Sequence, residues 1–294
     1  MDAIAHSAPD NALHRPRPSA VLTVRAAGHT DRGSVRNNNE DQFLVVSPAA
    51  LRSLDPSGAL VESQLLAVAD GMGGHAGGEL ASSIAVRSVR LSLLPAVESL
   101  PEACSSEAEL DARILAEMRH AVERAHESVR EEAELDPELA DMGTTLTVAY
   151  RHGNRLFVAH AGDSRCYLLR GGKLTQITRD HTLVNELIRG GFLQEGDEAQ
   201  AAFRNVLVNA LGGGSGETPR VELRRIELRS GDTVLLCTDG LNGMLSSADM
   251  AVVLNSYPDP QEAAVELVAL ANAAGGYDNI TAVVARVEAQ PGHG

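Results

Sequence analysis

The chain has 294 residues, a formal net charge of −15 and only 3% aromatic residues, with no tryptophan. Such an acidic chain disfavours nucleic acid and anionic membranes as partners, because both carry negative charge. No platform of aromatic side chains for stacking bases is visible. No stretch approaches the roughly eighteen apolar residues of a membrane span, and no signal peptide heads the chain. We therefore expect a protein with no nucleic-acid partner and no membrane partner.

The three cysteines, Cys104, Cys166 and Cys237, are widely spaced and form no Cys-x-x-Cys pair. Two of them, Cys166 and Cys237, fall within apolar runs that are typical of strands. Small buried hydrophobic residues are therefore favoured over disulfides or zinc ligands. This use of cysteine predicts a reducing, cytoplasmic location.

No linker rich in proline, glycine and serine divides the chain, so one domain is expected over residues 21–289. Residues 1–20 lack apolar periodicity, which predicts a disordered N-terminal tail, and residues 290–294 are expected to fray. Short apolar runs predict strands over residues 21–27, 42–46, 65–69, 144–151, 155–160, 165–170, 173–177, 221–228, 232–237 and 280–287. Helices are predicted over residues 79–94, 107–132, 180–190, 247–254 and 260–274. The second of them shows apolar residues at spacings of three and four.

Two segments are expected to lie outside these elements. Residues 51–63 are predicted to form a connecting loop, and residues 192–204, whose patterning is weak, a mobile insert. The predicted strands occur in groups and the helices in pairs, without βαβ alternation. This order predicts an α+β fold with antiparallel sheets and with helices packed outside them.

Four of the predicted strands meet an aspartate at one end. An Asp-Gly pair after a strand is, taken singly, a common turn signal. Aspartate is nevertheless unfavourable in strands and in apolar cores. Its repetition at strand ends therefore predicts carboxylates gathered at one rim of a sheet, where a hard cation would offset their repulsion. The four residues are Asp70, Asp163, Asp239 and Asp278.

The segment after the first of these aspartates favours a binding site over a turn. Residues 73–78 read Gly-Gly-His-Ala-Gly-Gly and lead directly into the predicted helix that begins at residue 79. This segment is too rich in glycine for a two-residue turn. A glycine-rich connection from strand to helix allows the backbone to approach a ligand closely.

The candidate metal ligands are all oxygen donors, and no His or Cys pair accompanies them at metal-binding spacing. Carboxylates and carbonyl groups suit Mg²⁺ or Mn²⁺ and not zinc. Gly71 has no side chain, which allows its carbonyl group to join a coordination shell. The set predicts two cations roughly 3.5–4 Å apart, the separation in two-metal hydrolytic sites. The candidate carboxylates are Glu40, Asp41, Asp70, Asp163, Asp239 and Asp278.

Arg36 precedes these acidic residues in the run Arg36-Asn37-Asn38-Asn39-Glu40-Asp41. Considered alone, it is best interpreted as a surface arginine that caps a loop. Beside a cluster of carboxylates and cations, its planar guanidinium is suited to bind a phosphate group bidentately. We therefore predict Arg36 to be a phosphate-binding residue.

With these residues in place, the chain resembles the metal-dependent Ser/Thr protein phosphatases, the PPM or type 2C class, in their compact bacterial form. The resemblance covers roughly residues 22–288, and the motifs lie in the family's order. They are Asp31-Arg32-Gly33 with Arg36 and residues 39–41, VADGMGGHAGGE at 68–79, GTTLTVAY at 143–150, AHAGDSRCYLLR at 159–170, LTQITRDHTLV at 174–184, LVNALGG at 207–213, LLCTDGLNGML at 235–245 and DNITAVVARV at 278–287.

The resemblance implies a four-layer α-β-β-α sandwich of two antiparallel sheets flanked by helix pairs, with the metals in a cleft at the rim of the sheets. A flap near residues 191–205 is implied to cover this cleft. Arg36 matches the phosphate-binding arginine of the family.

The resemblance also assigns metal-binding roles by motif position. It implies that Asp70 bridges two tightly bound Mn²⁺ or Mg²⁺ ions and that the Gly71 carbonyl binds one of them. The remaining carboxylates bind the second metal, directly or through water, or form a third, weaker metal site. Asp163 forms this third site together with Asp239. Those assigned to the second metal are Glu40, Asp41, Asp239 and Asp278.

One position departs from the eukaryotic pattern. Eukaryotic relatives place a candidate general acid, a histidine, directly after the Asp-Gly pair, whereas this chain has Met72 there, as bacterial members commonly do. His75 is the nearest replacement. A loop histidine without a catalytic contact is an equally good interpretation, because a general acid must reach the leaving oxygen.

The activity implied by the resemblance is hydrolysis of phosphoserine and phosphothreonine in proteins by a metal-activated water, without a phosphoenzyme. The expected partners are phosphorylated proteins and a cognate Ser/Thr kinase in bacterial signalling, and a monomer is expected. A catalytically silent, phosphoprotein-binding regulatory module of the same fold is the alternative. A two-metal nuclease or cyclic-nucleotide phosphodiesterase is a further alternative, which the lack of basic strips and stacking aromatics disfavours.

Overall fold

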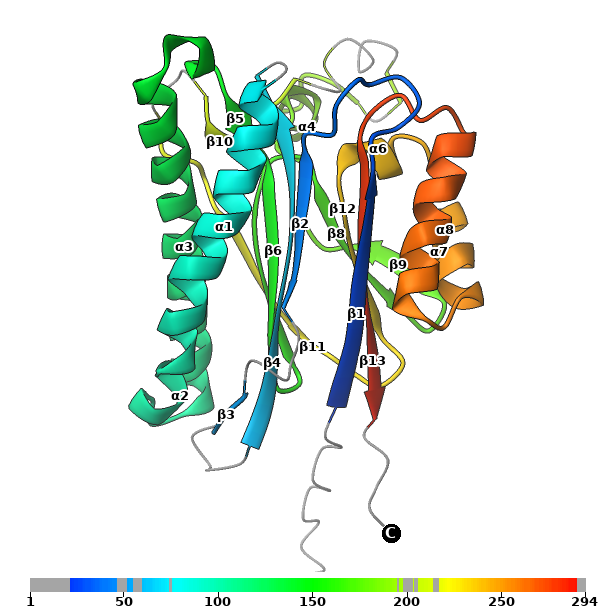
Figure 1. The fold of residues 1–294 in the computed structure, drawn as a ribbon. Helices are drawn as coiled ribbons and strands as arrows, with labels where there is room; N and C mark the ends of the chain where they lie inside the picture. The colour runs from blue at the N-terminus through cyan, green and yellow to red at the C-terminus, as the bar shows by residue number, and fades with distance from the viewer. Residues whose placement is uncertain are drawn as a thin grey trace, which may run out of the picture.

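In a computed structural model of the chain, the structure describes residues 22–46, 52–54, 60–73, 76–194, 196–197, 203, 206–213 and 217–289. The expected N-terminal tail and the last five residues lie outside this part of the chain. Two antiparallel sheets form the centre of the molecule, and helices cover the outer face of each (Figure 1). The predicted α+β class and the sandwich of two antiparallel sheets are confirmed.

The five-stranded sheet has the order β1-β13-β12-β8-β9, with β1 at Leu22–Asp31, β13 at Ile280–Ala289, β12 at Thr233–Cys237, β8 at Arg165–Arg170 and β9 at Lys173–Gln176. The larger sheet has the order β10-β5-β4-β6-β7-β11, with β10 at Leu211–Gly212, β5 at Gly143–Thr144, β4 at Leu60–Met72, β6 at Leu146–His152, β7 at Arg155–Ala161 and β11 at Glu222–Glu227. β2 (Asp41–Val46) and β3 (Arg52–Leu54) also pair with β4. Each of these strand pairs is antiparallel.

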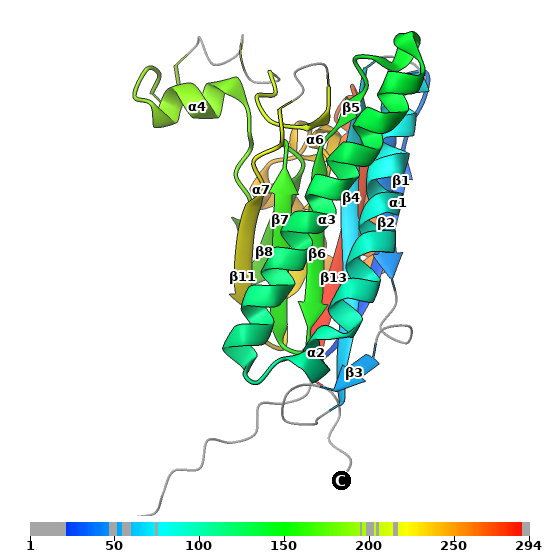
Figure 2. The ribbon, with the colours of Figure 1, turned by 90° about the vertical axis from the view of Figure 1, so that its left-hand side faces the viewer.

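Helices α1 (Ala76–Glu98) and α3 (Glu107–Leu135) cover the larger sheet, joined by the short α2 (Leu100–Ala103). Helices α7 (Ser247–Ser256) and α8 (Pro260–Ala273) cover the smaller sheet. The remaining helices in the described part of the chain are α4 (Leu183–Arg189), α6 (Asp239–Asn242) and the 3₁₀ turn η2 (Pro137–Leu139). Figure 2 shows α3 lying along the face of the larger sheet.

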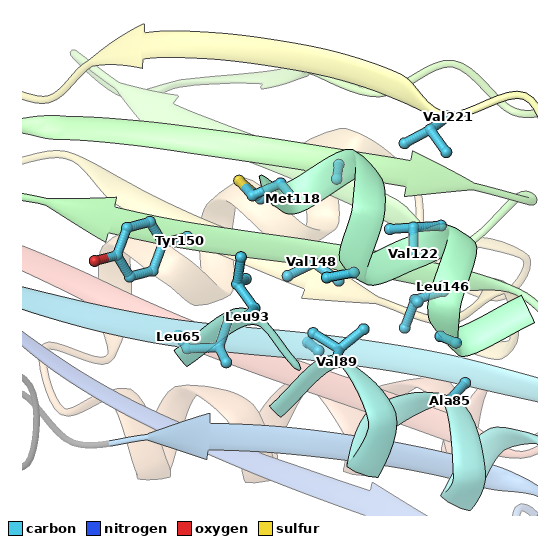
Figure 3. Packing of buried hydrophobic residues seen from close by; sticks show 14 of the residues in the cluster. Leu65, Ala85, Val89, Leu93, Met118, Val122, Leu146, Val148, Tyr150 and Val221 are labelled. Atoms are coloured by element: carbon cyan, nitrogen blue, oxygen red, sulfur yellow. The ribbon is translucent and has the colours of Figure 1, made fainter. Parts of the chain in front are cut away.

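The alternation of side chains along each strand explains the layers, since successive residues point to opposite faces. In β4, Leu65 and Ala67 pack against α1 and α3, whereas Leu66 and Val68 join the core between the two sheets. Leu65 and Val148 of the sheet lie close to Val89 and Leu93 of α1 (Figure 3). Because both faces of these strands are buried, the strands are apolar runs and not polar-apolar alternations.

The structure corrects two expectations. Residues 51–63 are not simply a loop, because β3 pairs with the first residues of β4. The local sequence there is polar, so only the pairing between strands reveals it. In addition, α1 is long and apolar enough to cross a membrane by length and composition alone. It instead packs on the protein core, with Ala81, Ala85 and Val89 fully buried.

The three cysteines are free and buried, as the sequence predicts, one in each apolar core.

Candidate metal centre

The directions of the strands bring the aspartates to one end of the sandwich. β4 and β7 both pair antiparallel with β6, so they run in the same direction and end at the same rim. Asp70 lies near the end of β4, and Asp163 follows the end of β7. β12 ends beside the start of β13, which places Asp239 and Asp278 together. This rim forms a cleft of about 510 Å³ whose lining includes all four aspartates.

Asp41, at the first residue of β2, is opposite Asp70 in the strand register and is buried. Its Oδ2 accepts hydrogen bonds of 2.7 Å from the hydroxyl groups of Thr238 and Thr281. The N–H of Thr281 donates in turn to Thr238 Oγ1 at 3.0 Å. Two segments distant in the sequence from Asp41 thus hold its carboxylate in one orientation, while its Oδ1 has no hydrogen-bond partner among the described residues.

The backbone around Asp70 is fixed by two threonines of the neighbouring strands. The N–H of Asp70 donates to Thr145 Oγ1 at 3.0 Å, and its carbonyl group accepts from Thr144 Oγ1 and from the Thr145 N–H, both at 2.9 Å. A Cβ atom at Gly71 would lie 2.1 Å from the Gly78 carbonyl oxygen. Any side chain at Gly71 would therefore push the glycine-rich start of α1 away from the rim.

Glu40 belongs to the same cleft, although it comes from the loop before β2. Its N–H donates to Asn279 Oδ1 at 2.8 Å, and its carbonyl group accepts from Ser82 Oγ at 2.6 Å. A Cβ atom at Gly78 would lie 2.0 Å from Glu40 Oε2. Gly78 therefore provides the space in which this carboxylate lies beside the start of α1.

Asp163 sits on a turn whose geometry depends on His181. Gly162, with a φ of +119°, donates its N–H to His181 Nδ1 at 3.1 Å and accepts from the His181 N–H at 2.7 Å. Asn209 also donates to His181 Nδ1, at 2.8 Å. An Nδ1 that accepts hydrogen bonds belongs to a neutral imidazole, and burial lowers the pKa of His181 to about 4.

His181 also lies near His160 and Glu222, with one ligand atom of each within 4.8 Å of the others. His160 Nε2 contacts the Arg179 carbonyl oxygen at 3.0 Å, so this nitrogen must carry the proton. Its Nδ1 contacts the hydroxyl group of Thr147 at 2.8 Å. Both nitrogens of His160 are thereby in use, which favours a structural role for this group over metal binding.

Arg36 lies beside the carboxylates. Its guanidinium donates to Asp278 Oδ2 at 2.6 Å, and 56% of the side chain is exposed. This hydrogen bond raises the pKa of Arg36, so the residue is a permanent cation at the mouth of the cleft.

The clustered carboxylates strongly perturb one another. Burial, followed by the charges of Asp239 and Asp278, raises the pKa of Asp41 to about 7. Burial and then the charge of Asp239 raise the pKa of Asp163 to about 7. The pKa values of Asp70 and Asp239 are raised for the same reasons, burial first and neighbouring carboxylates second. Such a cluster is unfavourable unless protons or cations neutralise it.

The donor set fits hard divalent cations. All side-chain donors are carboxylates, and one oxygen each of Asp41 and Asp239 is buried without a hydrogen-bond partner in the described part of the chain. A buried acceptor with no donor is costly unless an ion or water binds it. Oxygen-only sites of this kind suit Mg²⁺ or Mn²⁺.

The structure thus brings together most of the residues singled out in the sequence. The lining of the cleft includes Arg36, Glu40, Asp70, Gly71, Asp163, Asp239 and Asp278. Asp41 lies directly behind it, through its register partner Asp70. His75 lies outside the described residues, as does most of the predicted flap, of which residues 191–194, 196–197 and 203 are described.

Sequence reasoning missed the residues that hold the carboxylates in place. Thr238 and Asn279 were visible as direct neighbours of Asp239 and Asp278, but their roles depend on contacts with residues 197 and 239 positions earlier. Thr145 and His181 act in the same way on Asp70 and on the Asp163 turn. The polar neighbours of Asp239 and Asp278 are a signal that could have indicated Thr238 and Asn279, whereas no local signal indicates Thr145 or His181.

Comparisons with known proteins agree on one family. Residues 54–281 match the protein phosphatase 2C family. The chain is 38% identical over 267 residues to the serine/threonine protein phosphatase PstP of Mycobacterium tuberculosis, which covers 91% of this chain and 46% of PstP. The chain therefore spans about half the length of that relative. It is 34% identical over 265 residues to the serine/threonine phosphatase stp of Listeria monocytogenes, covering 89% of this chain and 95% of that protein.

Solved structures give the same result. The crystal structure of the Mycobacterium tuberculosis phosphatase PstP/Ppp superposes with a TM-score of 0.72 at 38% identity, covering 91% of this chain and 99% of that one. The catalytic domain of PstP in complex with two manganese ions superposes with a TM-score of 0.69 at 37% identity and the same coverage.

Proposed function

Because the chain belongs to the protein phosphatase 2C family, we propose that it hydrolyses phosphoserine and phosphothreonine in proteins with the help of bound divalent cations. The observation that carries this proposal is the cleft itself, in which carboxylates with buried, unpartnered oxygens lie beside an exposed arginine. Such a cleft combines a cation site with a phosphate-binding group.

We propose Mn²⁺ or Mg²⁺ as the cations, two bound tightly and a third more weakly. The manganese complex of PstP supports Mn²⁺. Bound cations supply an activated water nucleophile near neutral pH and positive charge for the phosphoryl oxygens. The proposed ligands are the Gly71 carbonyl and the carboxylates Glu40, Asp41, Asp70, Asp163, Asp239 and Asp278.

The protein's own contribution is to hold these groups in place before substrate binds. Thr238 and Thr281 fix the Asp41 carboxylate, and Thr144 and Thr145 fix the Asp70 backbone. Fixed groups do not have to reorganise as charge develops in the transition state, which is a large part of electrostatic catalysis. We propose that water attacks the phosphate group directly, without a phosphoenzyme.

Arg36 is proposed to bind two oxygens of the phosphate group. Its side chain is exposed at the cleft mouth, and its one ion pair among the described residues, with Asp278, leaves other N–H groups of the guanidinium available. His75 is kept as a candidate general acid, and a flap near residues 191–205 as a gate for protein substrates. We further propose that the protein is a monomer with one domain over residues 21–289. It is proposed to act in the cytoplasm and to oppose a cognate Ser/Thr kinase. The three free cysteines support a cytoplasmic location.

Metal removal tests the proposed function. Dialysis against EDTA should abolish hydrolysis of phosphoserine and phosphothreonine peptides, and added Mn²⁺ should restore it, because the cation supplies the nucleophile. Release of inorganic phosphate is the measurement. A cyclic nucleotide and single-stranded DNA serve as substrates for the alternative two-metal activities. Phosphopeptide binding without phosphate release in Mn²⁺ would instead favour the catalytically silent module.

Arg36→Ala should raise KM for phosphopeptides more than it lowers kcat, because a guanidinium that holds the phosphate group in ground state and transition state alike contributes uniform binding. The small ester p-nitrophenyl phosphate should show the same change, since the contact is to phosphate and not to peptide. Steady-state kinetics on both substrates are the measurement. Arg32→Ala, an exposed arginine of the same loop, is the matched control. Unchanged kinetics in Arg36→Ala would return this residue to a surface role.

A further inference from the structure

A second hollow of about 790 Å³ lies beside α4, and five arginines line it. We call it the arginine groove and define it by Arg165, Arg179, Arg189, Arg220 and Arg224. Helix α4 contributes Arg189, and β11 contributes Arg224. Figure 2 shows α4 beyond the ends of β7 and β11, at the side of the sheet.

Positive charge exceeds negative charge in this groove. Three carboxylates among the described residues line it, those of Asp180, Glu186 and Glu222. Over the described lining, five guanidinium groups against three carboxylates leave a local excess of two positive charges, in a chain whose net charge is −15. A concave surface with an excess of one sign of charge attracts groups of the opposite sign.

Arg165 and Arg224 pair with carboxylates that are largely buried, whereas the other three arginines do not. Arg165 makes a two-pronged contact with Asp180, from Nε at 2.8 Å and from NH2 at 2.6 Å, and only 25% of its side chain is exposed. Arg224, whose side chain is 39% exposed, pairs with Glu222, whose side chain is 10% exposed. These two ion pairs line the groove.

Arg189 and Arg220 share the single carboxylate of Glu186, and their side chains are 63% and 54% exposed. Arg179 is exposed and makes no side-chain hydrogen bond or ion pair with any described residue. Exposed ion pairs are weak, roughly 0–1 kcal/mol each. These three guanidinium groups can therefore turn toward an incoming anion at little cost.

The arginine groove is continuous with the metal cleft. A third hollow, of about 520 Å³, shares Asp163, Asp239 and Asp278 with the metal cleft. It shares Arg165, Asp180, Asn185 and Ile188 with the arginine groove. The middle hollow also contains Met244 and Tyr277, and Tyr277 is 65% exposed. A polypeptide can thus extend from the carboxylates, past apolar side chains, to the arginines.

We propose that the arginine groove is a subsite for an anionic side chain of the substrate protein, either an acidic residue or a second phosphorylated residue near the one being hydrolysed. This proposal rests on the proposed function, since it places the reacting phosphoresidue at the metal cleft. The guanidinium fork matches carboxylate and phosphate oxygens alike. The enzyme is then selective for acidic or multiply phosphorylated segments despite its own negative charge.

The test uses Arg179→Glu, because this side chain has no partner among the described residues whose loss would disturb the fold, and Arg220→Gln as a milder second variant. Arg119→Glu is the control, because it makes the same change of charge at an exposed arginine of α3, outside the arginine groove. Three phosphothreonine peptide sets differ only in the residues that flank the phosphothreonine on either side. These residues are alanine, glutamate or a second phosphothreonine.

We expect Arg179→Glu to lower kcat/KM for the acidic and doubly phosphorylated peptides about three- to tenfold, mainly through KM. Its effect on the alanine-flanked peptide and on p-nitrophenyl phosphate should stay below about twofold, and the control should leave all substrates unchanged. A loss confined to the doubly phosphorylated set would assign the subsite to phosphate, and a loss on both sets to anions in general. Equal effects on neutral and acidic peptides would overturn the proposal.

Binding of the same peptides, labelled with fluorescein and followed by anisotropy, separates this proposal from the proposed function. If the wild-type protein releases no phosphate but still binds acidic peptides more tightly than neutral ones, and Arg179→Glu removes that preference, the groove is an anion subsite and the catalytic proposal is wrong. If the wild-type protein hydrolyses the neutral peptide but shows no acidic preference in rate or binding, the groove proposal is wrong and the catalytic one stands.

Discussion

Replacing Asp70 by asparagine should lower kcat for phosphopeptides on the order of a hundredfold or more, while it raises the melting temperature of the metal-free protein. The first effect follows because the charge that binds the cations is lost, which removes several kcal/mol of transition-state stabilisation. The second follows because the burial of Asp70, and then repulsion from its neighbouring carboxylates, raises its pKa. These neighbours are Asp41, Asp239, Asp163 and Asp278. An amide of the same shape relieves this repulsion.

The expected rise in melting temperature is about 2–4 °C, the shift that roughly 1 kcal/mol produces in a domain near this size. Sites arranged for function often reduce stability, and their neutralisation restores it. Thermal unfolding in EDTA and steady-state kinetics in Mn²⁺ are the two measurements. Glu131→Gln, which removes an exposed carboxylate of α3, should change neither. A metal-free Asp70→Asn protein that unfolds at a lower temperature than wild type would contradict this account of the cluster.

The stabilisation of the protein by Mn²⁺ should increase steeply with pH. In the metal-free protein the pKa values of Asp41 and Asp163 are about 7, whereas carboxylates in the unfolded chain titrate near pH 4. Between these values the folded state binds more protons than the unfolded state, so the stability of the metal-free protein falls as pH rises through about 7. Cations replace these protons and remove this loss, and protons compete with them at lower pH.

The measurement is the difference in melting temperature between saturating Mn²⁺ and EDTA, which should be at least about twice as large at about pH 8 as at about pH 5.5. The buried histidines His160 and His181, with pKa values lowered by burial to about 3 and about 4, have the opposite pH dependence. Because these histidines are neutral in the folded state, the folded protein loses stability as pH falls below about 6.5, with or without Mn²⁺. Their contribution therefore cancels in the difference in melting temperature between Mn²⁺ and EDTA. An equal stabilisation by Mn²⁺ at both pH values would show that these carboxylates are already ionised without metal.

The sequence alone determined the elements of the fold that are long and apolar. The strands at Leu22–Asp31 and Ile280–Ala289 and the helix at Glu107–Leu135 were predicted within a few residues at most ends, because apolar periodicity is a local property. The short polar strand β3 and the two-residue β10 were missed, since such strands exist only through pairing with a distant segment.

The chemistry of the site was also readable along the chain. Aspartate is out of place at the end of an apolar run, so its repetition is enough to indicate a carboxylate cluster. The glycines of residues 73–78 indicated a close approach of the backbone to another group, and the structure shows one such approach, that of Gly78 to the carboxylate of Glu40.

Only the tertiary structure decided how these carboxylates are held. Thr238 and Thr281 orient Asp41 across separations of 197 and 240 residues, yet a threonine at a strand end looks the same whether it orients a carboxylate or only packs, because β-branched residues favour strands everywhere. The arginine groove is a second example. Arg179, Arg189 and Arg220 are spread over more than forty positions of an acidic chain, and they form a positive surface only because α4 folds back beside β11. Residue type is local and fixes the chemistry available, whereas its orientation and its neighbours depend on long-range pairing, which no local pattern records.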